Sequence, residues 1–377
     1  MALTGKSIFA KIAAMTEKDF VPKDLSEEIK EGKTTWQSPS NIALVKYWGK
    51  KENQVPANPS ISFTLNSCRT TTTLAYRKRA KKATDFDFKV YFEGERKESF
   101  EPKIQEFFQR VEQYLPFLKD FSFYIETSNT FPHSSGIASS ASGMSALALC
   151  LMDLEKMMAP QMGKNYFLQK ASFLARLGSG SDCRSIEGNL VVWGKHRNIP
   201  GSSDLFGVKY PGEVHDNFRN YQDTILLVDK GEKQVSSSLG HGLMNDHPFA
   251  ENRFEQAHGN LNKLQEIFRS GNLSEFIKVV ESEALTLHAM MMTSQPYFLL
   301  MKPNTLAIIN SIFSFRKETG LHLCFTLDAG ANVHLLYPEY EKEETLEFIK
   351  AELLEYCEKE QFILDGTGDG AEKVELA

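Results

Sequence analysis

Residues 134–145 read Ser-Ser-Gly-Ile-Ala-Ser-Ser-Ala-Ser-Gly-Met-Ser, and all but Ile137 and Met144 are Gly, Ala or Ser. Such side chains leave the backbone open to a ligand, and a run with helical apolar spacing follows directly. A small-residue loop that opens into a helix presents unpaired N–H groups and the positive end of the helix dipole. We therefore expect an anion site, with phosphate as the anion. A Gly/Ser loop before a tightly packed helix has the same composition, so this alternative stays open.

Bulk properties predict a cytoplasmic enzyme. A chain of 377 residues favours two domains, and a net charge of -6 argues against nucleic acid as the main partner. The five cysteines are widely spaced without a C-x-x-C pair, which indicates reduced thiols and no zinc framework. No apolar run has the length of a membrane span, so no membrane partner is expected. Residues 1–33 are charged and mixed in character, which predicts an extension outside the core.

The apolar patterns predict a mixed helix and strand protein. Strands are expected at 41–49, 60–75, 88–93, 121–126, 189–193, 224–228, 322–327 and 332–337. Helices are expected at 103–114, 142–158, 165–177, 248–270, 274–290, 303–318 and 341–358. The segment 194–220 is rich in Gly, Pro, Asp and Asn and is a candidate domain boundary.

Residues 38–50 read Ser-Pro-Ser-Asn-Ile-Ala-Leu-Val-Lys-Tyr-Trp-Gly-Lys. Asn41, Lys46, Tyr47 and Lys50 lie within ten positions, and two cations, a phenol and an amide can together bind a polyanion. A solvated strand edge would have the same composition.

Residues 178–185, Gly-Ser-Gly-Ser-Asp-Cys-Arg-Ser, place Arg184 one turn into an expected helix. Arginine suits forked binding of a carboxylate, whereas a Ser cap followed by a surface Arg is the alternative.

Two further segments carry polar residues in turns. In Phe325–Asn332, Asp328 stands at a strand end before small residues, where it can face a ligand as a base or metal ligand. Asp-x-Gly turns without catalytic role are also common. Residues 366–370, Gly-Thr-Gly-Asp-Gly, have the composition of a second phosphate-contacting loop or of a tail turn.

Together these segments resemble the diphosphomevalonate decarboxylases of the GHMP kinase superfamily. The stretch 41–50 resembles the family's Asn-Ile-Ala-x-x-Lys-Tyr-Trp-Gly-Lys strand, and 58–62 resembles Asn-Ser-Ser-(Leu/Ile)-Ser with Pro59 in place of the first Ser. The stretch 129–141 is similar to Asn-x-Phe-Pro-Thr-Ala-Ala-Gly-Leu-Ala-Ser-Ser-Ala, and 178–185 to Gly-Ser-Gly-Ser-Ala-Cys-Arg-Ser. Residues 326–332 resemble Thr-Phe-Asp-Ala-Gly-Pro-Asn, and a short element at 235–237 also matches. The motifs occur in family order.

The resemblance implies an α+β, two-domain GHMP kinase fold with the active site in the inter-domain cleft. It implies a division into an N-terminal extension (1–33), an ATP-binding domain (34–200) and a C-terminal domain (201–377). A homodimer is the expected assembly. The implied reaction converts mevalonate 5-diphosphate and ATP into isopentenyl diphosphate, ADP, phosphate and CO2.

The resemblance also implies roles for individual residues. Asp328 would face the 3-hydroxyl as base, Arg184 with Asn41 would hold the C1 carboxylate, and Lys46 would lie near the reacting groups. Ser181 would lie there too, while the substrate's diphosphate would contact Tyr47, Lys50 and Ser237. The ATP phosphates would be held by Ser134, Ser135, Gly136, Ala138, Ser139 and Ser140. Mg2+ would be bound mainly by those phosphates, with no metal ligand assigned to the protein.

The chain departs from the family pattern at three places. His133-Ser134-Ser135 replaces Thr-Ala-Ala, Asp182 replaces Ala, and Leu285-Thr286-Leu287-His288 keeps only the His of Asp-Ser-Asn-x-Phe-His. An extra carboxylate beside Arg184 would weaken binding of a dianion unless it points away. A mevalonate 3-kinase, a phosphomevalonate decarboxylase, a sugar or homoserine kinase of the same superfamily, and a non-catalytic ligand-binding homologue therefore remain alternatives.

Overall fold

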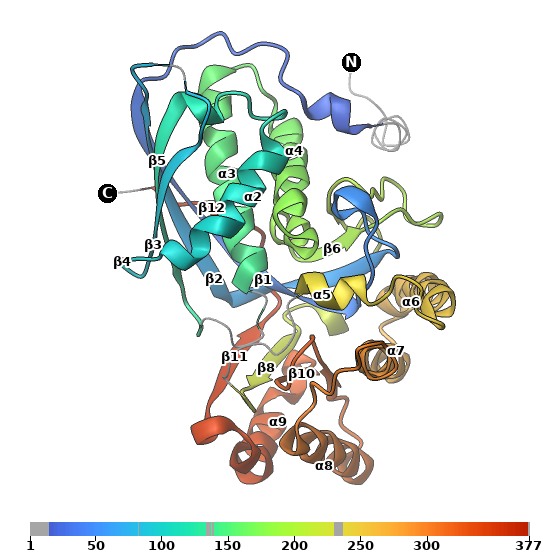
Figure 1. The fold of residues 1–377 in the computed structure, drawn as a ribbon. Helices are drawn as coiled ribbons and strands as arrows, with labels where there is room; N and C mark the ends of the chain where they lie inside the picture. Colours follow the sequence, from blue (N-terminus) through green and yellow to red (C-terminus); the bar gives the residue numbers. More distant parts are fainter. Residues whose placement is uncertain (1–14, 82, 133–136, 138, 230–236, 376–377) are drawn as a thin grey trace.

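The structure is a computed structural model that describes residues 15–81, 83–132, 137, 139–229 and 237–375, with only the backbone for 139, 140, 237 and 238. Two lobes each contain a sheet and helices, and they lie one above the other in Figure 1. Within the described residues, the first sheet has eight strands in the order β12-β1-β2-β5-β3-β4, and β6 and β7 extend it from β2. These strands are β1 (Glu31–Val45), β2 (Ser60–Lys78), β3 (Asp87–Phe92), β4 (Glu95–Arg96), β5 (Phe121–Asn129), β6 (Leu190–Trp193), β7 (Val208–Lys209) and β12 (Glu372–Lys373).

Three helices cover one face of this sheet: α2 (Glu101–Val111), α3 (Ser139–Met158) and α4 (Lys164–Gly178). Helix α2 buries Ile104, Phe107, Phe108 and Val111, whose i, i+3, i+4, i+7 spacing places them on one side. Helix α3 is buried along most of its length because it packs against β1 and β2 on one side and α4 on the other. The helix that follows the Ser/Gly-rich loop is thus the centre of this lobe.

The second lobe has a four-stranded antiparallel sheet in the order β11-β8-β10-β9, counted over the described residues. Its strands are β8 (Gln222–Leu226), β9 (Cys324–Thr326), β10 (Val333–Tyr337) and β11 (Phe362–Gly366). Its helices are α5 (Ser237–Gly242), α6 (Ala250–Ser270), α7 (Leu273–Met292), α8 (Pro303–Thr319) and α9 (Lys342–Phe348). The strand–turn–strand unit β9–β10 places residues 327–332 at the edge that faces the first lobe (Figure 1).

The lobes share an apolar core. Ile42 and Phe63 of the first sheet belong to the same buried cluster as Ile225, Leu261 and Phe276 of the second lobe. The chain also returns to the first lobe after β11, because β12 pairs with β1 through Trp36 opposite Lys373. The proposed division at residue 200 therefore does not separate the sheets, since β7 and β12 both follow it and both join the first sheet.

Most predicted strands and helices are found close to their expected bounds, but the first strand spans Glu31–Val45 instead of 41–49, and the sequence patterns do not predict β4, β7, β11 and β12. Three further expectations differ. Residues 342–348 are α-helical, but 349–353 form a π-helical turn and 354–356 a 3₁₀ turn, so the expected single helix at 341–358 is wrong in its second half. The expectation that residues 1–33 lie outside the core is wrong for the part that is described. Phe20 is fully buried and stacks on Phe173 with ring centroids 4.3 Å apart.

The third difference concerns residues 366–370. Gly368 donates its backbone N–H to Thr64 O at 2.8 Å, and a Cβ on Gly368 would lie 2.5 Å from Asn66 Cα. The glycine is needed for this close approach of two backbones. The segment joins β11 to β12 along the first sheet, so it is a tight structural connection and does not line the cavity described below.

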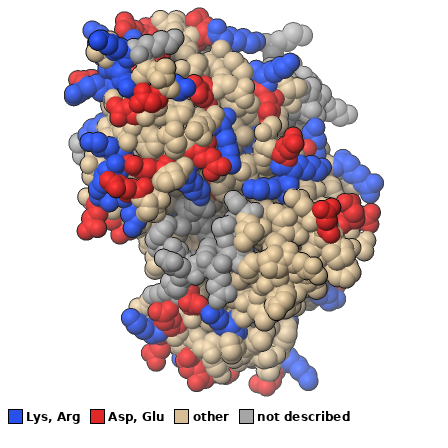
Figure 2. All heavy atoms as spheres, viewed as in Figure 1, with Lys and Arg blue, Asp and Glu red and all other residues tan. Residues whose placement is uncertain are grey.

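On the face shown in Figure 2, acidic and basic side chains are interspersed over both lobes. Among the described residues, no helix combines the length and the apolar character that crossing a bilayer would require.

Candidate active site

A cavity of about 340 Å³ lies where the two lobes meet. The first lobe supplies the β1 end, the turn after α4 and part of α2, and the second lobe supplies α5, α7 and the β9–β10 turn. Seven side chains that the sequence singled out line it together: Asn41, Lys46, Tyr47, Lys50, Ser181, Arg184 and Asp328. Residues more than 280 positions apart in the chain thus meet in one polar cavity.

The ion pair between Lys46 and Asp328 joins the lobes inside this cavity. Lys46 Nζ lies 3.1 Å from Asp328 Oδ1. The Lys46 side chain is 2% exposed and that of Asp328 is 31% exposed, so the lysine is buried beneath a carboxylate that the cavity reaches. Burial lowers the pKa of Lys46, and the Asp328 charge opposes that effect. The ammonium therefore depends on this carboxylate as its counter-charge.

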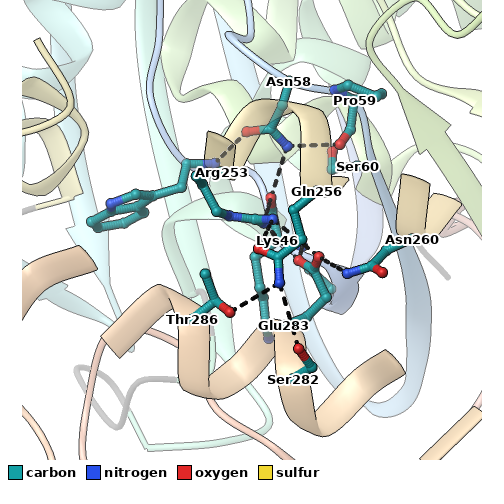
Figure 3. A network of polar contacts seen from close by, with 12 residues as sticks. Lys46, Asn58, Pro59, Ser60, Arg253, Gln256, Asn260, Ser282, Glu283 and Thr286 are labelled. Carbon is teal, nitrogen blue, oxygen red and sulfur yellow. Dashed lines mark hydrogen bonds and ion pairs between the residues drawn. The ribbon is translucent and has the colours of Figure 1, made fainter. Parts of the chain in front are cut away.

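The backbone of Lys46 is fixed by buried polar groups of both lobes (Figure 3). Its N–H donates to Glu283 Oε2 at 2.9 Å, and its carbonyl accepts from Arg253 Nη2 and from Asn58 Nδ2, each at 3.0 Å. Arg253 and Glu283 form a buried ion pair of 2.6 Å, and Asn260 Nδ2 donates to Glu283 Oε1 at 2.7 Å. This network holds the lysine at the end of β1 in one backbone conformation.

Arg184 is buried and presents its guanidinium to the same cavity. Its Nη1 donates to Ser60 Oγ at 2.5 Å and its Nε to Asn41 Oδ1 at 3.3 Å. Asn41 is itself held because its Nδ2 donates to Ser185 Oγ at 2.8 Å. Nη2 has no hydrogen-bond partner among the residues that the structure describes. The arrangement leaves an oriented cationic donor for a carboxylate.

The turn after α4 lies tightly against Tyr47. A Cβ on Gly180 would lie 2.9 Å from the Tyr47 hydroxyl oxygen and 2.7 Å from Trp193 Cη2, so this position requires glycine. The Tyr47 hydroxyl is buried and has no hydrogen-bond partner among the described residues. Burial raises the pKa of Tyr47, so the phenol keeps its proton and is an unused donor.

The outer end of the cavity is formed by Lys50 and by charged residues of α2, namely Lys103, Glu106 and Arg110. Lys50 Nζ donates to Gln54 Oε1 at 3.2 Å. Arg110 pairs with Glu106 and donates to Leu177 O at 3.0 Å. Burial and the nearby Arg110 charge lower the pKa of Lys50, as expected for two cations at one end of a site.

Asp182, the acidic departure from the family pattern, is buried and does not line the cavity. Ser181 Oγ donates to its Oδ1 at 3.3 Å, while Oδ2 has no hydrogen-bond partner among the described residues. Burial raises the pKa of Asp182 well above the usual range, which favours the uncharged acid. A neutral carboxyl under the turn removes the repulsion that an extra negative charge beside Arg184 would produce.

The turn that carries Asp328 is supported by His288 of α7. His288 Nε2 lies 3.1 Å from the Asp328 carbonyl oxygen. It can donate a hydrogen bond to that oxygen in the tautomer that carries the ring proton on Nε2. Burial lowers the pKa of His288 to about 4, so the ring is neutral at physiological pH. Leu287 beside it lines the cavity, which shows what the altered 285–288 stretch contributes here.

A second cavity, of about 190 Å³ and mainly apolar, adjoins the first. It is formed by β2, β3, β5, the start of α2 and the first turns of α3, with Val90, Ile125 and Met144 among its lining residues. Gly143 opens it from α3, because a Cβ there would have no neighbour within 4 Å. Lys103 lines both cavities and lies at their boundary.

Several predicted residues fall outside what can be placed. Ser134, Ser135, Gly136, Ala138 and His133 lie outside the described residues. For Ser139 and Ser140 the structure gives the backbone of the first α3 residues, and for Ser237 that of the first α5 residue. Their roles stay predictions.

Sequence reasoning missed His241, Glu283 and Lys103, and it singled out His288 only as a residue that the family pattern retains. The charged side chains of α2 recur at i, i+3 and i+7, which is also the spacing of an ordinary solvent-exposed helix face. His241 lies between two glycines, and Glu283 and His288 lie on a helix with no motif around them, so only the packing of α5 and α7 against the first lobe brings them to the site.

Family models match both parts of the chain. Residues 38–205 match the diphosphomevalonate decarboxylase-like N-terminal domain, and residues 224–374 match the mevalonate 5-diphosphate decarboxylase C-terminal domain. Diphosphomevalonate decarboxylase of Ganoderma lucidum is 28% identical over 335 residues, covering 84% of this chain and 80% of that one.

Two solved structures share the fold. The complex of MDDEF with MVAPP, AMPPCP and magnesium has a TM-score of 0.77 at 27% identity and covers 92% of this chain and 100% of that one. Mevalonate diphosphate decarboxylase of Staphylococcus aureus has a TM-score of 0.77 at 26% identity, with 92% and 98% covered. Two adjoining domain matches and a shared fold over nearly the whole length lead to one assignment. This chain belongs to the diphosphomevalonate decarboxylase family of ATP-dependent decarboxylases.

Proposed function

We propose that this protein decarboxylates mevalonate 5-diphosphate with ATP, giving isopentenyl diphosphate, ADP, phosphate and CO2. The observation that carries the proposal is one cavity in which Asp328 with Lys46 faces Arg184 across the lobe junction. Because MDDEF, which shares this fold, forms a complex with MVAPP, AMPPCP and magnesium, the same ligands are the natural candidates here.

The chemistry requires three functions from the protein. A tertiary hydroxide leaves poorly, so the 3-hydroxyl is first phosphorylated. Departure of the resulting phosphate group then develops positive charge at C3, and the neighbouring carboxylate is lost as CO2. The site must therefore bring the hydroxyl to the terminal phosphate of ATP, hold the carboxylate and neutralise charge.

We assign these functions to the cavity side chains. Asp328 accepts a hydrogen bond from the 3-hydroxyl and receives its proton during phosphoryl transfer. Lys46 balances the charge of that carboxylate and lies beside the oxygens between which the phosphoryl group moves. Arg184, held by Asn41 and Ser60, binds the C1 carboxylate. Tyr47 and Lys50 donate to the diphosphate, with Ser181 on the same wall.

We place the nucleotide in the 190 Å³ cavity. Its apolar lining suits the faces of a purine ring, and Thr127 and Asn129 supply polar atoms at its edge. From there the phosphates would extend along Lys103 toward the N-terminus of α3, where unpaired backbone N–H groups favour anions. The two cavities adjoin at Lys103, so this placement brings the terminal phosphate to the substrate cavity.

The described residues contain no cluster of three or more His, Cys, Asp or Glu side chains suited to a metal ion. We propose that Mg2+ is carried mainly by ATP oxygens, with the α3 N-terminus as the adjoining protein surface. Bound in this way, Mg2+ supplies charge neutralisation on the phosphates. A cytoplasmic location and a homodimer stay predictions.

The direct test is a coupled measurement of ADP and CO2 release with mevalonate, its 5-phosphate and its 5-diphosphate. Equal amounts of ADP and CO2, with the highest kcat/KM for the diphosphate, are expected. ADP without CO2 would make the protein a 3-kinase, and preference for the 5-phosphate would make it a phosphomevalonate decarboxylase. Neither product with any of the three would contradict an enzymatic role on these substrates.

A further inference from the structure

His241 of α5 enters the substrate cavity beside two residues of the 41–50 motif. Its ring centroid lies 4.1 Å from that of Tyr47 and 4.8 Å from that of Trp48. The close approach depends on Gly240, because a Cβ at that position would lie 2.6 Å from Trp48 Cη2. The imidazole is buried but lines the cavity along with Lys50 and Arg184.

A backbone hydrogen bond fixes the tautomer of this ring. Gly49 N–H donates to His241 Nδ1 at 3.1 Å, so Nδ1 carries a lone pair. In a neutral imidazole the proton is then on Nε2. Nε2 has no hydrogen-bond partner among the described residues. Burial, together with the charges of Lys50 and Arg184, lowers the pKa of His241 to about 3, which keeps the ring neutral.

We propose that His241 binds the diphosphate end of the substrate through an Nε2–H donor that carries no charge. The bond to Gly49 holds the ring next to the 41–50 motif, where the charges of Lys50 and Arg184 act on it. Lys50 and Arg110 line the same cavity, and Arg110 is paired with Glu106. A neutral donor adds a hydrogen bond to a phosphate oxygen without adding a further cation to the unliganded site. This inference rests on the proposed function for the identity of the substrate.

Two substitutions separate binding from mere support of Gly49. In His241→Asn, the amide oxygen can replace Nδ1 as acceptor for Gly49 N–H, while the donor at the Nε2 position is lost. In His241→Gln, the longer side chain places an N–H near the Nε2 position, while the acceptor for Gly49 is lost. A supporting role predicts that Asn is tolerated and Gln is not, whereas our proposal predicts the reverse.

The experiment measures calorimetric binding of mevalonate 5-diphosphate and, separately, of inorganic pyrophosphate to the wild-type protein and both variants. We expect His241→Asn to weaken both ligands by about tenfold to a hundredfold, as for a lost hydrogen bond to a charged group, and His241→Gln to stay within about threefold of wild type. In turnover, His241→Asn should raise the KM for the substrate and leave the KM for ATP unchanged.

Unchanged binding of both ligands to His241→Asn would overturn the proposal, as would loss of binding in His241→Gln alone. The pyrophosphate measurement keeps the test independent of substrate identity. If wild type binds pyrophosphate through His241 but does not turn over mevalonate 5-diphosphate, the proposed function fails and the assignment of His241 stands. A 15N imidazole spectrum of the free protein that shows the proton on Nδ1 would also overturn it.

Discussion

Asp328 Oδ1 and Lys46 Nζ, 3.1 Å apart, connect the turn after β9 in one lobe to the end of β1 in the other. The lysine is buried on every other side, whereas the carboxylate is open to the cavity. A substrate hydroxyl can therefore reach the carboxylate without displacing the lysine. This asymmetry distinguishes a carboxylate that a ligand can reach from a buried ion pair that only joins two lobes.

Replacing Asp328 by Asn should abolish turnover and spare binding. The amide keeps the shape and hydrogen-bonding ability of the side chain but can neither take up the proton nor balance the Lys46 charge. We expect turnover to fall by roughly 10²–10⁴, the range for a positioned general base, with ATP and substrate affinities within about tenfold of wild type. Rapid-quench measurement of ADP and CO2 checks this. ADP formation at the wild-type rate without CO2 would mean that Asp328 acts only after phosphoryl transfer, contrary to the assigned role.

Replacing Arg184 by Gln should lower decarboxylation by orders of magnitude while the protein stays folded, because the carboxylate loses its oriented cation. Arg184→Lys is the matched control. A point charge lacks the fork that reaches Ser60, Asn41 and the substrate together, so it should restore little activity. Steady-state kinetics with a thermal unfolding control measures both variants. Near-normal turnover of Arg184→Gln would exclude the carboxylate-binding role.

Filling the smaller cavity from α3 should impair nucleotide binding without loss of stability. A leucine at Gly143 would extend into open space, and removing a glycine from a helix interior stabilises it by up to about 1 kcal/mol. We expect the KM for ATP to rise at least tenfold with an unchanged or higher Tm. Gly259→Leu on α6 is the control, because a Cβ there also has no neighbour within 4 Å but lines neither cavity. Equal ATP affinities in the two variants would place the purine elsewhere.

Acid should destabilise the protein in part through His288. Its pKa is about 4 in the folded protein and 6.5 when unperturbed, so below pH 6.5 the unfolded chain binds the proton first. Stability is therefore lost as pH falls from 6.5 to 4, by at most about 3 kcal/mol, and is independent of this group above 6.5.

His288→Gln isolates the effect of that titration. The amide can still donate to Asp328 O but does not titrate, so the variant should lose less stability over the same pH interval. Urea unfolding of both proteins at pH 7.5, 6 and 4.5 measures the difference. Parallel pH profiles would mean that His288 is protonated without cost in the folded protein.

The sequence predicts this site well where the chemistry is local. Arg184 lies in a Gly/Ser-rich turn and Asp328 follows a strand, so each segment carries its own signal, although the groups that hold Arg184, Ser60 and Asn41, lie on distant strands. The buried residues that support the site from other parts of the chain carry no such local signal. Glu283, on α7, reaches Lys46 across 237 positions of sequence, and Phe20 packs into a core that forms only when α4 is in place. Nothing in the residues next to Glu283 or Phe20 encodes these partners, so they follow from the assembled lobes alone.

The chain crosses between the lobes twice, once before the first strand of the second sheet, β8, and once after its last strand, β11. Asp365 accepts backbone N–H groups of Asn66, Ser67 and Cys68 at 2.8 Å each, just before the chain rejoins β1 through β12. Around Lys46, Glu283 and Arg253 attach the second lobe a third time. Three attachments between the lobes exclude a hinge motion that swings one lobe away from the other. Substrate entry and product exit must therefore rely on local movement of segments at the rim, while the floor of the cavity keeps its form through the catalytic cycle.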